Sequence, residues 1–217
     1  MISSLTNYTS LSPNNSGLRL YPVTRITPHI VVGQFDALTV ASWFNKPSRK
    51  ASANYIIGMN GEVVLNVEEE NRAWTSGNKD NDNRAITIEC ACDKISPWAM
   101  NSDVYNKLID LCVDICKRYN KKRLIWIKDK NTALTYQLAD NEMLLTKHAF
   151  FENVACWGTW FDEHVDDFVN RVNTKLTDDC NKLYRVQVGA FRDKNNAIKL
   201  CQELKQRGYN DAFIKEV

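Results

Sequence analysis

The sequence lacks any long apolar segment. A membrane-spanning helix needs about 20 consecutive apolar residues, and no run of that kind occurs in the 217 residues. The first residues, Met1 to Asn7, have neither the basic region nor the apolar core of a secretory signal. We therefore expect a protein without membrane insertion and without a signal peptide.

A strong net charge is also absent. The chain carries 28 basic and 26 acidic residues, a net charge of +2, whereas nucleic-acid-binding domains usually show a pronounced basic excess. We therefore expect no nucleic-acid partner. The seven cysteines are odd in number and scattered along the chain, which is typical of reduced thiols and not of a disulfide framework.

Histidine is scarce, with three in the chain, so each position is informative. His29 lies in an apolar stretch that predicts a strand, and His148 and Cys156 lie eight residues apart in a loop-like stretch, His148–Gly158. Imidazole and thiolate ligands favour a soft divalent ion such as zinc, and a catalytic zinc site combines three protein ligands with one open position. His29, His148 and Cys156 are therefore a candidate zinc site.

Other interpretations stay open at this point. Cys156 is also compatible with a buried apolar thiol or with the nucleophile of a cysteine peptidase. His164, the third histidine, lies among acidic residues in a helical pattern and is more simply part of a solvated helix face. Two further cysteine pairs fall on faces expected to be core and are interpreted as structural thiols: Cys90 with Cys92, and Cys112 with Cys116.

The spacing of apolar residues predicts alternating strands and helices. Strands are expected over Val23–Val32, Ala53–Met59, Glu62–Val67, Ala85–Ala91 and Arg123–Ile127, and helices over Leu38–Phe44, Val104–Tyr119 and Asp162–Val172. Residues 1–20, 71–84 and 129–141 are expected to be irregular. Asn60-Gly61 predicts a hairpin between the second and third strands. Pro28 predicts that its strand is an edge strand, is bulged or ends near that residue.

Glu89 is the one charge in the predicted buried strand Ala85–Ala91. A buried carboxylate requires a partner. It therefore either pairs with a cation such as Arg25 or Arg84, or acts as a general base beside an activated water. Spacing alone does not distinguish the two roles.

The composition changes at residues 177–182, which indicates a linker. Beyond it, the pattern predicts a strand over 183–191, a helix capped by Asp193 and stopped at Gly208, and a strand over 211–217. We therefore divide the chain into a larger domain of residues 1–176, which carries the candidate zinc site, a linker of residues 177–182 and a β-α-β module of residues 183–217.

Several spaced segments of the larger part carry a family likeness. They are Ser12–Asn14, Ile26–His29, Ala51–Tyr55, Asn60-Gly61, Val67–Glu69, Arg72–Trp74, Asn81–Glu89 and His148–Gly158. In this order they resemble the type 2 N-acetylmuramoyl-L-alanine amidases, with the closest likeness to endolysins of clostridial phages and prophages. The likeness covers about residues 5–175. It implies an α/β fold with a mixed central sheet flanked by helices, as in peptidoglycan recognition proteins.

The resemblance also implies one zinc ion per chain, held by His29, His148 and Cys156, with Glu89 as the catalytic glutamate. The implied reaction is hydrolysis of the amide between N-acetylmuramic acid and L-alanine of bacterial peptidoglycan. The implied setting is an endolysin that stays in the host cytoplasm until lysis and then acts on the cell wall. A host autolysin and a non-catalytic peptidoglycan-binding module are the alternatives.

Three further positions, Trp74, Asn54 and Asn83, match the family's groove and are expected to contact the substrate. The chain also departs from the family. It has Cys156-Trp157-Gly158 where Cys-Pro-Gly is usual, and Val154 where a polar or basic residue is frequent. We therefore expect the metal ligands to be retained and the loop around them to differ.

The C-terminal segment has a likeness of its own, carried by Tyr184–Phe191, Ala197, Leu200, Leu204 and Gly208-Tyr209. It resembles the first half of a sporulation-related (SPOR) repeat, a repeat that binds peptidoglycan glycan strands and has two β-α-β halves. A single half of about 35 residues buries too little apolar surface to be stable alone. Our hypothesis is that two chains pair their halves into one sheet, which gives a homodimer.

Overall fold

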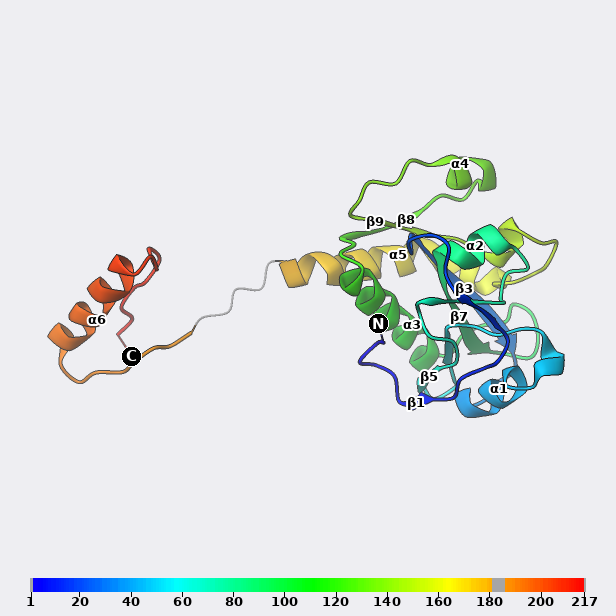
Figure 1. Cartoon of the computed structure of the whole chain (residues 1–217), viewed down its shortest axis with the longest axis horizontal. Helices are drawn as coiled ribbons and strands as arrows, with labels where there is room; N and C mark the ends of the chain where they lie inside the picture. Colours follow the sequence, from blue (N-terminus) through cyan, green and yellow to red (C-terminus); the bar gives the residue numbers. More distant parts are fainter. Residues whose placement is uncertain (1, 181–185, 217) are drawn as a thin grey trace. The chain divides into compact units, whose positions relative to one another are not determined.

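The computed structural model describes residues 2–180 and 186–216 (Figure 1). The chain divides into two units, Met1–Cys180 and Asn181–Val217, and each is described by itself. Among the described residues, no helix combines the length and the apolar character that crossing a membrane requires.

The first unit is built on a seven-stranded sheet with the order β1-β5-β4-β7-β3-β9-β8. The strands are β1 (Tyr8–Thr9), β3 (Arg25–Val32), β4 (Tyr55–Ile57), β5 (Val63–Leu65), β7 (Ala85–Cys92), β8 (Arg123–Trp126) and β9 (Glu142–Leu145). The strands from β4 to β8 in this order run parallel, and β5 is antiparallel to β4. The mixed sheet and the hairpin at Asn60-Gly61 are therefore confirmed.

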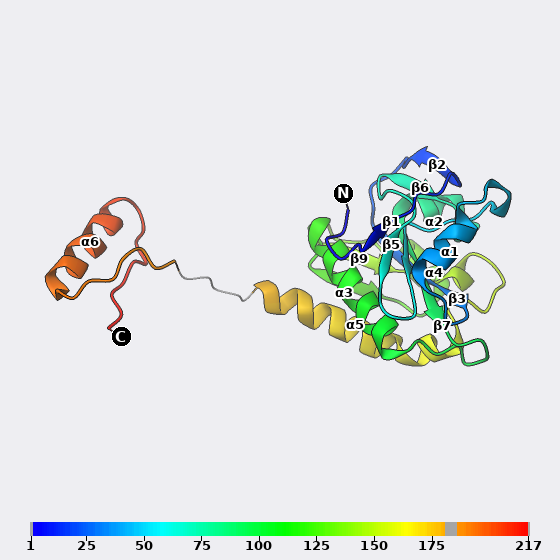
Figure 2. The ribbon, with the colours of Figure 1, turned by 90° about the horizontal axis from the view of Figure 1, so that it is seen from below.

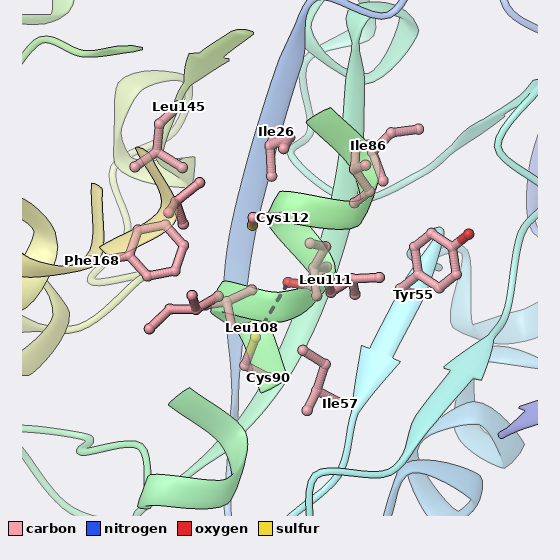
Figure 3. Close-up of a cluster of buried hydrophobic side chains, with 14 of the residues drawn as sticks. Ile26, Tyr55, Ile57, Ile86, Cys90, Leu108, Leu111, Cys112, Leu145 and Phe168 are labelled. Carbon is pink, nitrogen blue, oxygen red and sulfur yellow. Dashed lines mark hydrogen bonds between the residues drawn. The ribbon is translucent and has the colours of Figure 1, made fainter. Parts of the chain in front are cut away.

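Helices cover both faces of the sheet (Figures 1 and 2). They are α1 (Ala37–Phe44), α2 (Lys79–Arg84), α3 (Ser102–Arg118), α4 (Lys130–Thr135) and α5 (Thr159–Cys180), with 3-10 turns η1 (Pro47–Arg49) and η2 (His148–Phe150). On one face, α3 and α5 bury Leu108, Leu111 and Phe168 against strand residues such as Ile26 and Ile86 (Figure 3). On the other face, α1 packs on β4 and β5.

The two cysteine pairs lie in the core between β7 and α3, Cys90 and Cys92 on the strand and Cys112 and Cys116 on the helix, which confirms their interpretation as structural thiols. Three stretches expected to be irregular contain short elements instead. Residues 1–20 include β1 and β2 (Asn15–Leu18), residues 71–84 include β6 (Asn71–Ala73) and α2, and residues 129–141 include α4. Elements of two to six residues are too short to show a periodic pattern.

Pro28 lies within an unbroken strand, so the predictions that β3 is bulged or ends there are wrong. The prediction of an edge strand is also wrong for β3 as a whole, which lies between β7 and β9. Strand β9 pairs with only the first two residues of β3. Ile26 accepts a hydrogen bond from Thr146 on that side, and Ile30 donates one to Cys156 Sγ. Because backbone groups alternate along a strand, Pro28 faces the same side, beyond the β9 pairing. Its missing amide hydrogen therefore removes no hydrogen bond from the sheet.

Helix α5 continues through the start of the predicted linker, so residues 177–180 are helical and residues 181–182 lie outside the described residues. The apolar stripe of this helix extends beyond the predicted end at Val172, because Leu176 is also buried. Packing on the core therefore lengthens the helix past the change in composition.

The second unit contains α6 (Lys194–Gln206). Asp193 caps it by accepting a hydrogen bond from the Asn195 amide, and Gly208 follows its end with φ of 97°, as the sequence predicts. The expected strands are not formed in the described residues 186–191 and 211–216, and residues 183–185 and 217 lie outside the description. No residue from 186 to 216 is fully buried.

Candidate metal centre

The structure brings the three predicted metal ligands together. His29 projects from the middle of β3, His148 begins η2 just after β9, and Cys156 lies in the loop before α5. Their candidate ligand atoms all lie within 4.8 Å of one another. The centroids of the two imidazole rings are 4.7 Å apart. Because β9 runs beside β3, the chain leaving β9 passes next to His29.

The chemistry of these residues fits a zinc ion. His29 is 2% exposed, and its Nε2 atom has no hydrogen-bond partner among the described residues. Burial and the neighbouring His148 hold the pKa of His29 well below its ordinary value, so the ring is in the neutral form that binds metals. An unpaired buried nitrogen is costly, and coordination to a metal would relieve that cost.

The environment of Cys156 disfavours a cysteine peptidase. Burial, followed by the nearby Glu89 carboxylate, raises the pKa of the Cys156 thiol. Reactive cysteines have lowered pKa values, whereas coordination to zinc removes the proton of a thiol outright. Cys156 is therefore better suited to bind a metal than to attack a substrate.

Glu89 lies on β7 directly beside His29, its partner in the parallel register of β3 and β7. The first of its two alternative roles, an ion pair with Arg25 or Arg84, is not observed, and both arginines pair with Asp80 instead. The Oε2 atom of Glu89 is buried and has no hydrogen-bond partner among the described residues. Burial raises the pKa of Glu89 to about 7, although the charge of Arg49 acts in the opposite direction. A carboxyl group with this pKa exchanges protons readily at neutral pH.

Glu69 is a buried carboxylate with a structural role, and its surroundings differ from those of Glu89. Glu69 is fully buried, and Arg118 donates to both of its oxygens at 2.6 Å. The hydroxyl groups of Tyr55 and Tyr119 donate to it as well. Glu69 is fully paired, whereas Oε2 of Glu89 has no partner among the described residues. This contrast indicates that Glu89 serves a functional site and does not stabilise the fold.

Glu89 is expected to destabilise the metal-free protein at neutral and alkaline pH. Its pKa is 4.5 as a free side chain and about 7 in the fold, so the folded state binds the proton more tightly. Stability from this group is fully present below pH 4.5 and is lost as the pH rises through 7. We expect Glu89→Gln to increase the free energy of unfolding by about 2–3 kcal/mol more at pH 8 than at pH 5.

Urea denaturation of metal-free protein at the two pH values measures this difference. Glu163→Gln is a matched control, because Glu163 is exposed on α5 and should show no such pH dependence. A gain for Glu89→Gln that is equal at pH 5 and pH 8 would contradict the raised pKa.

The predicted substrate contacts lie in different surroundings. Asn54 is fully buried, and its Oδ1 atom accepts hydrogen bonds from Arg19 and from the Thr87 amide. The structure therefore gives Asn54 a place inside the fold and not on a groove surface. Asn83 is also largely buried but borders a surface hollow of about 360 Å³. Trp74 is half-buried and donates from Nε1 to Ser16 Oγ at 2.6 Å.

Two residues near the site were not anticipated from the sequence. The Oε2 atom of Glu152 lies 3.3 Å from His148 Nε2, and the charge of Arg49 acts on Glu89. The spacing of four residues between His148 and Glu152 is a signal that suggests their contact. Arg49 is separated from Glu89 by 40 positions, and no sequence pattern connects them.

Comparison with protein-family models gives independent evidence of the family to which the chain belongs. The family model described as N-acetylmuramoyl-L-alanine amidase matches residues 19–149, more than half of the chain, and includes His29, Glu89 and His148. The chain belongs to this amidase family. It is accordingly a hydrolase that acts on an amide bond of peptidoglycan in the cell wall. A second family model, the SPOR domain, matches residues 171–216, which confirms the C-terminal resemblance and begins earlier, within α5.

Solved structures of this amidase's fold give the same architecture. The catalytic domain of XlyA is 14% identical, with a TM-score of 0.56 over 77% of this chain and 99% of that chain. AmpD is 17% identical, with a TM-score of 0.53 over 80% and 94%. The hydrolase AmiA of Staphylococcus aureus, solved with its ligand, is 12% identical, with a TM-score of 0.55 over 81% and 85%. At these identities the likeness shows the fold. Among curated proteins, none matches the chain.

Proposed function

We propose that the amidase is zinc-dependent, with one zinc ion per chain held by His29, His148 and Cys156, and with Glu89 as the catalytic residue that moves the proton. The observation that carries the proposal is the meeting of three ligand atoms within 4.8 Å beside a carboxylate oxygen that has no hydrogen-bond partner among the described residues. A module that only binds peptidoglycan has no need of this combination.

Zinc, when bound, supplies a Lewis acid that polarises the scissile carbonyl group and lowers the pKa of water. Glu89 in its carboxylate form accepts a proton from the attacking water, whose oxygen forms the new bond to the carbonyl carbon. The carbon–nitrogen bond then breaks, and Glu89 returns the proton to the amide nitrogen of L-alanine. In the metal-free protein burial raises the pKa of Glu89 to about 7, and the charge of a bound zinc ion would lower it toward the carboxylate form that accepts the proton. Trp74 and Asn83 are proposed to contact the substrate along its groove.

The proposed setting is bacterial lysis. The SPOR match at residues 171–216 supports a role of the C-terminal segment in holding the amidase on glycan strands. Together with the motif resemblance to endolysins of clostridial phages and prophages, this favours an enzyme that waits in the host cytoplasm and acts on the wall during lysis. A host autolysin is the alternative.

We also propose that the C-terminal unit pairs with a second copy. Its apolar side chains are largely exposed, with Val186 at 84%, Val188 at 60% and Phe213 at 61%, and burial of such side chains favours association. We expect a homodimer at micromolar concentration by light scattering, and a monomer for the double variant Val186→Asp with Val188→Asp. A monomeric wild-type protein would contradict the pairing.

Digestion of purified cell wall tests the proposed catalysis. Wild-type protein should release free amino groups, and a strong chelator or Glu89→Ala should abolish the release. Release that survives the chelator would instead indicate a cysteine peptidase that uses Cys156. No release by the wild-type protein would indicate a binding module.

A further inference from the structure

We propose that Asp162 is a positioning residue that sets the separation of His148 and Cys156, an inference that rests on the proposed zinc site. The two ligands lie on one loop, residues 147–158, here named the ligand loop. Lys147 directly precedes His148, and Trp157 directly follows Cys156. The Oδ1 atom of Asp162 accepts a hydrogen bond from Lys147 Nζ at 2.8 Å and from Trp157 Nε1 at 2.7 Å. One carboxylate oxygen therefore joins both flanks of the loop.

The position of the Lys147 ammonium group is fixed from several directions. Its Nζ atom lies about 6 Å from the ring centroids of Trp126, Phe150 and Trp157, within the range of cation–π attraction. The side chain is only 18% exposed. The Asp162 side chain is 45% exposed, so solvent screens the charge attraction of this pair. The aromatic rings nevertheless fix the Lys147 donor, and its hydrogen bond to Asp162 therefore acts mainly by positioning the loop.

The indole of Trp157 fixes the other flank. Trp157 is 1% exposed, and its ring lies 5.2 Å from that of Trp126 and 4.6 Å from that of Phe161, centroid to centroid. A buried indole N–H group requires an acceptor, and Asp162 provides it. Where the family usually has proline, this chain therefore has a side chain that packs in the core and also donates to the carboxylate.

The backbone of the ligand loop closes on itself at the same place. The Ala149 amide donates to the Cys156 carbonyl oxygen at 3.2 Å, which ties the residue after His148 to Cys156 itself. Asp162 lies in the first turn of α5, a helix that packs on the core. The Asp162 carboxylate thus ties both flanks of the ligand loop to α5, in addition to the packing of Trp157 in the core.

Removal of this anchor should weaken metal binding more than folding. Changes in the groups that orient metal ligands typically cost about 10–100-fold in affinity. We expect Asp162→Ala to lower zinc affinity by about this factor, measured by competition with a chromogenic chelator. Asp166→Ala is the matched control, because Asp166 is exposed on the same helix, and its zinc affinity should equal that of the wild type. The thermal midpoint of the metal-free protein should stay at the wild-type value in Asp166→Ala and fall by a few degrees in Asp162→Ala, because that change leaves the buried Trp157 indole N–H group without its acceptor.

A second variant keeps the test independent of the folding of Asp162→Ala. Trp157→Phe retains a buried aromatic ring but lacks the indole N–H group, so it should also lower zinc affinity. Its effect should not add fully to that of Asp162→Ala, because both remove the same hydrogen bond. With cobalt in place of zinc, both variants should alter the thiolate-to-metal charge-transfer band, which reports on Cys156 directly.

The outcomes separate the two proposals. Wild-type zinc affinity in both Asp162→Ala and Trp157→Phe, or an equal loss in Asp166→Ala, would overturn the role of Asp162 and leave the zinc site intact. A wild-type protein that binds no zinc would overturn the zinc site and the role of Asp162 together.

Discussion

Glu89→Gln is expected to lower kcat for wall hydrolysis by about 10²–10⁴-fold, the usual contribution of a general acid–base group. Glutamine keeps the size of the side chain but accepts no proton. Because Glu89 lies beside His29 and is not among the three candidate ligands, zinc content should remain at one ion per chain. Measurement of kcat together with the metal content of the purified variant checks both expectations.

Glu163→Gln, the exposed control on α5, should retain wild-type kcat. Two results would count against the assigned role of Glu89. One is a Glu89→Gln enzyme with nearly wild-type turnover. The other is a loss of activity that follows a loss of zinc, since Glu89 would then act by supporting the metal ligands.

Substitution of Cys156 should separate a metal ligand from a nucleophile. Cys156→Ala removes one of three ligands, and we expect loss of bound zinc and a fall in kcat of about 10³-fold, equivalent to several kcal/mol of transition-state stabilisation. Cys156→Asp offers a carboxylate oxygen, which also coordinates zinc. We therefore expect the aspartate variant to keep measurable zinc and part of the activity.

Parallel zinc analysis and wall-hydrolysis assays of the two variants provide the measurement. A nucleophilic cysteine would make both variants equally inactive while zinc content stays unrelated to activity. Equal loss of zinc and activity in both variants would show that the site does not accept a carboxylate in place of the thiolate, and the chelator response would then decide between the two roles.

The sequence predicts which three residues meet at the candidate metal site, because the chemistry of metal ligands is restrictive. Histidine is scarce in the chain, and His148 and Cys156 share one loop-like stretch. The structure adds the reason for their meeting, which is the parallel pairing of β9 with β3. Strand β9 itself was not predicted, since its sequence Glu-Met-Leu-Leu has no alternation and no β-branched residue.

The hydrogen-bond and ion-pair partners of side chains are less predictable from the sequence than helices and strands are. The sequence leaves Glu89 with two roles, and the choice depends on Asp80, which binds both candidate arginines. Asn54 shows the same limit, because a polar residue in a motif can equally well serve the interior of the fold. The two hydrogen bonds that Asp162 accepts from Lys147 and Trp157 depend on tertiary packing, which sequence spacing does not indicate.

In the C-terminal unit, the helix is predicted correctly from nearby residues, whereas the strands, which need a pairing partner, are not. The N-cap residue Asp193 and the stop near Gly208 act within a few residues, and α6 forms as predicted. A strand requires a neighbour that supplies hydrogen bonds, and the described residues on either side of α6 do not form one. Association with a second copy, as proposed above, would supply that neighbour.

Identification of the chain ends released from purified peptidoglycan tests the central claim most directly. The amidase should create new amino-terminal L-alanine and no new reducing sugar ends, and the reaction should stop on chelation and resume when zinc is added back. New amino termini other than alanine, new reducing ends, or alanine release that continues in the chelator would contradict a zinc-dependent N-acetylmuramoyl-L-alanine amidase.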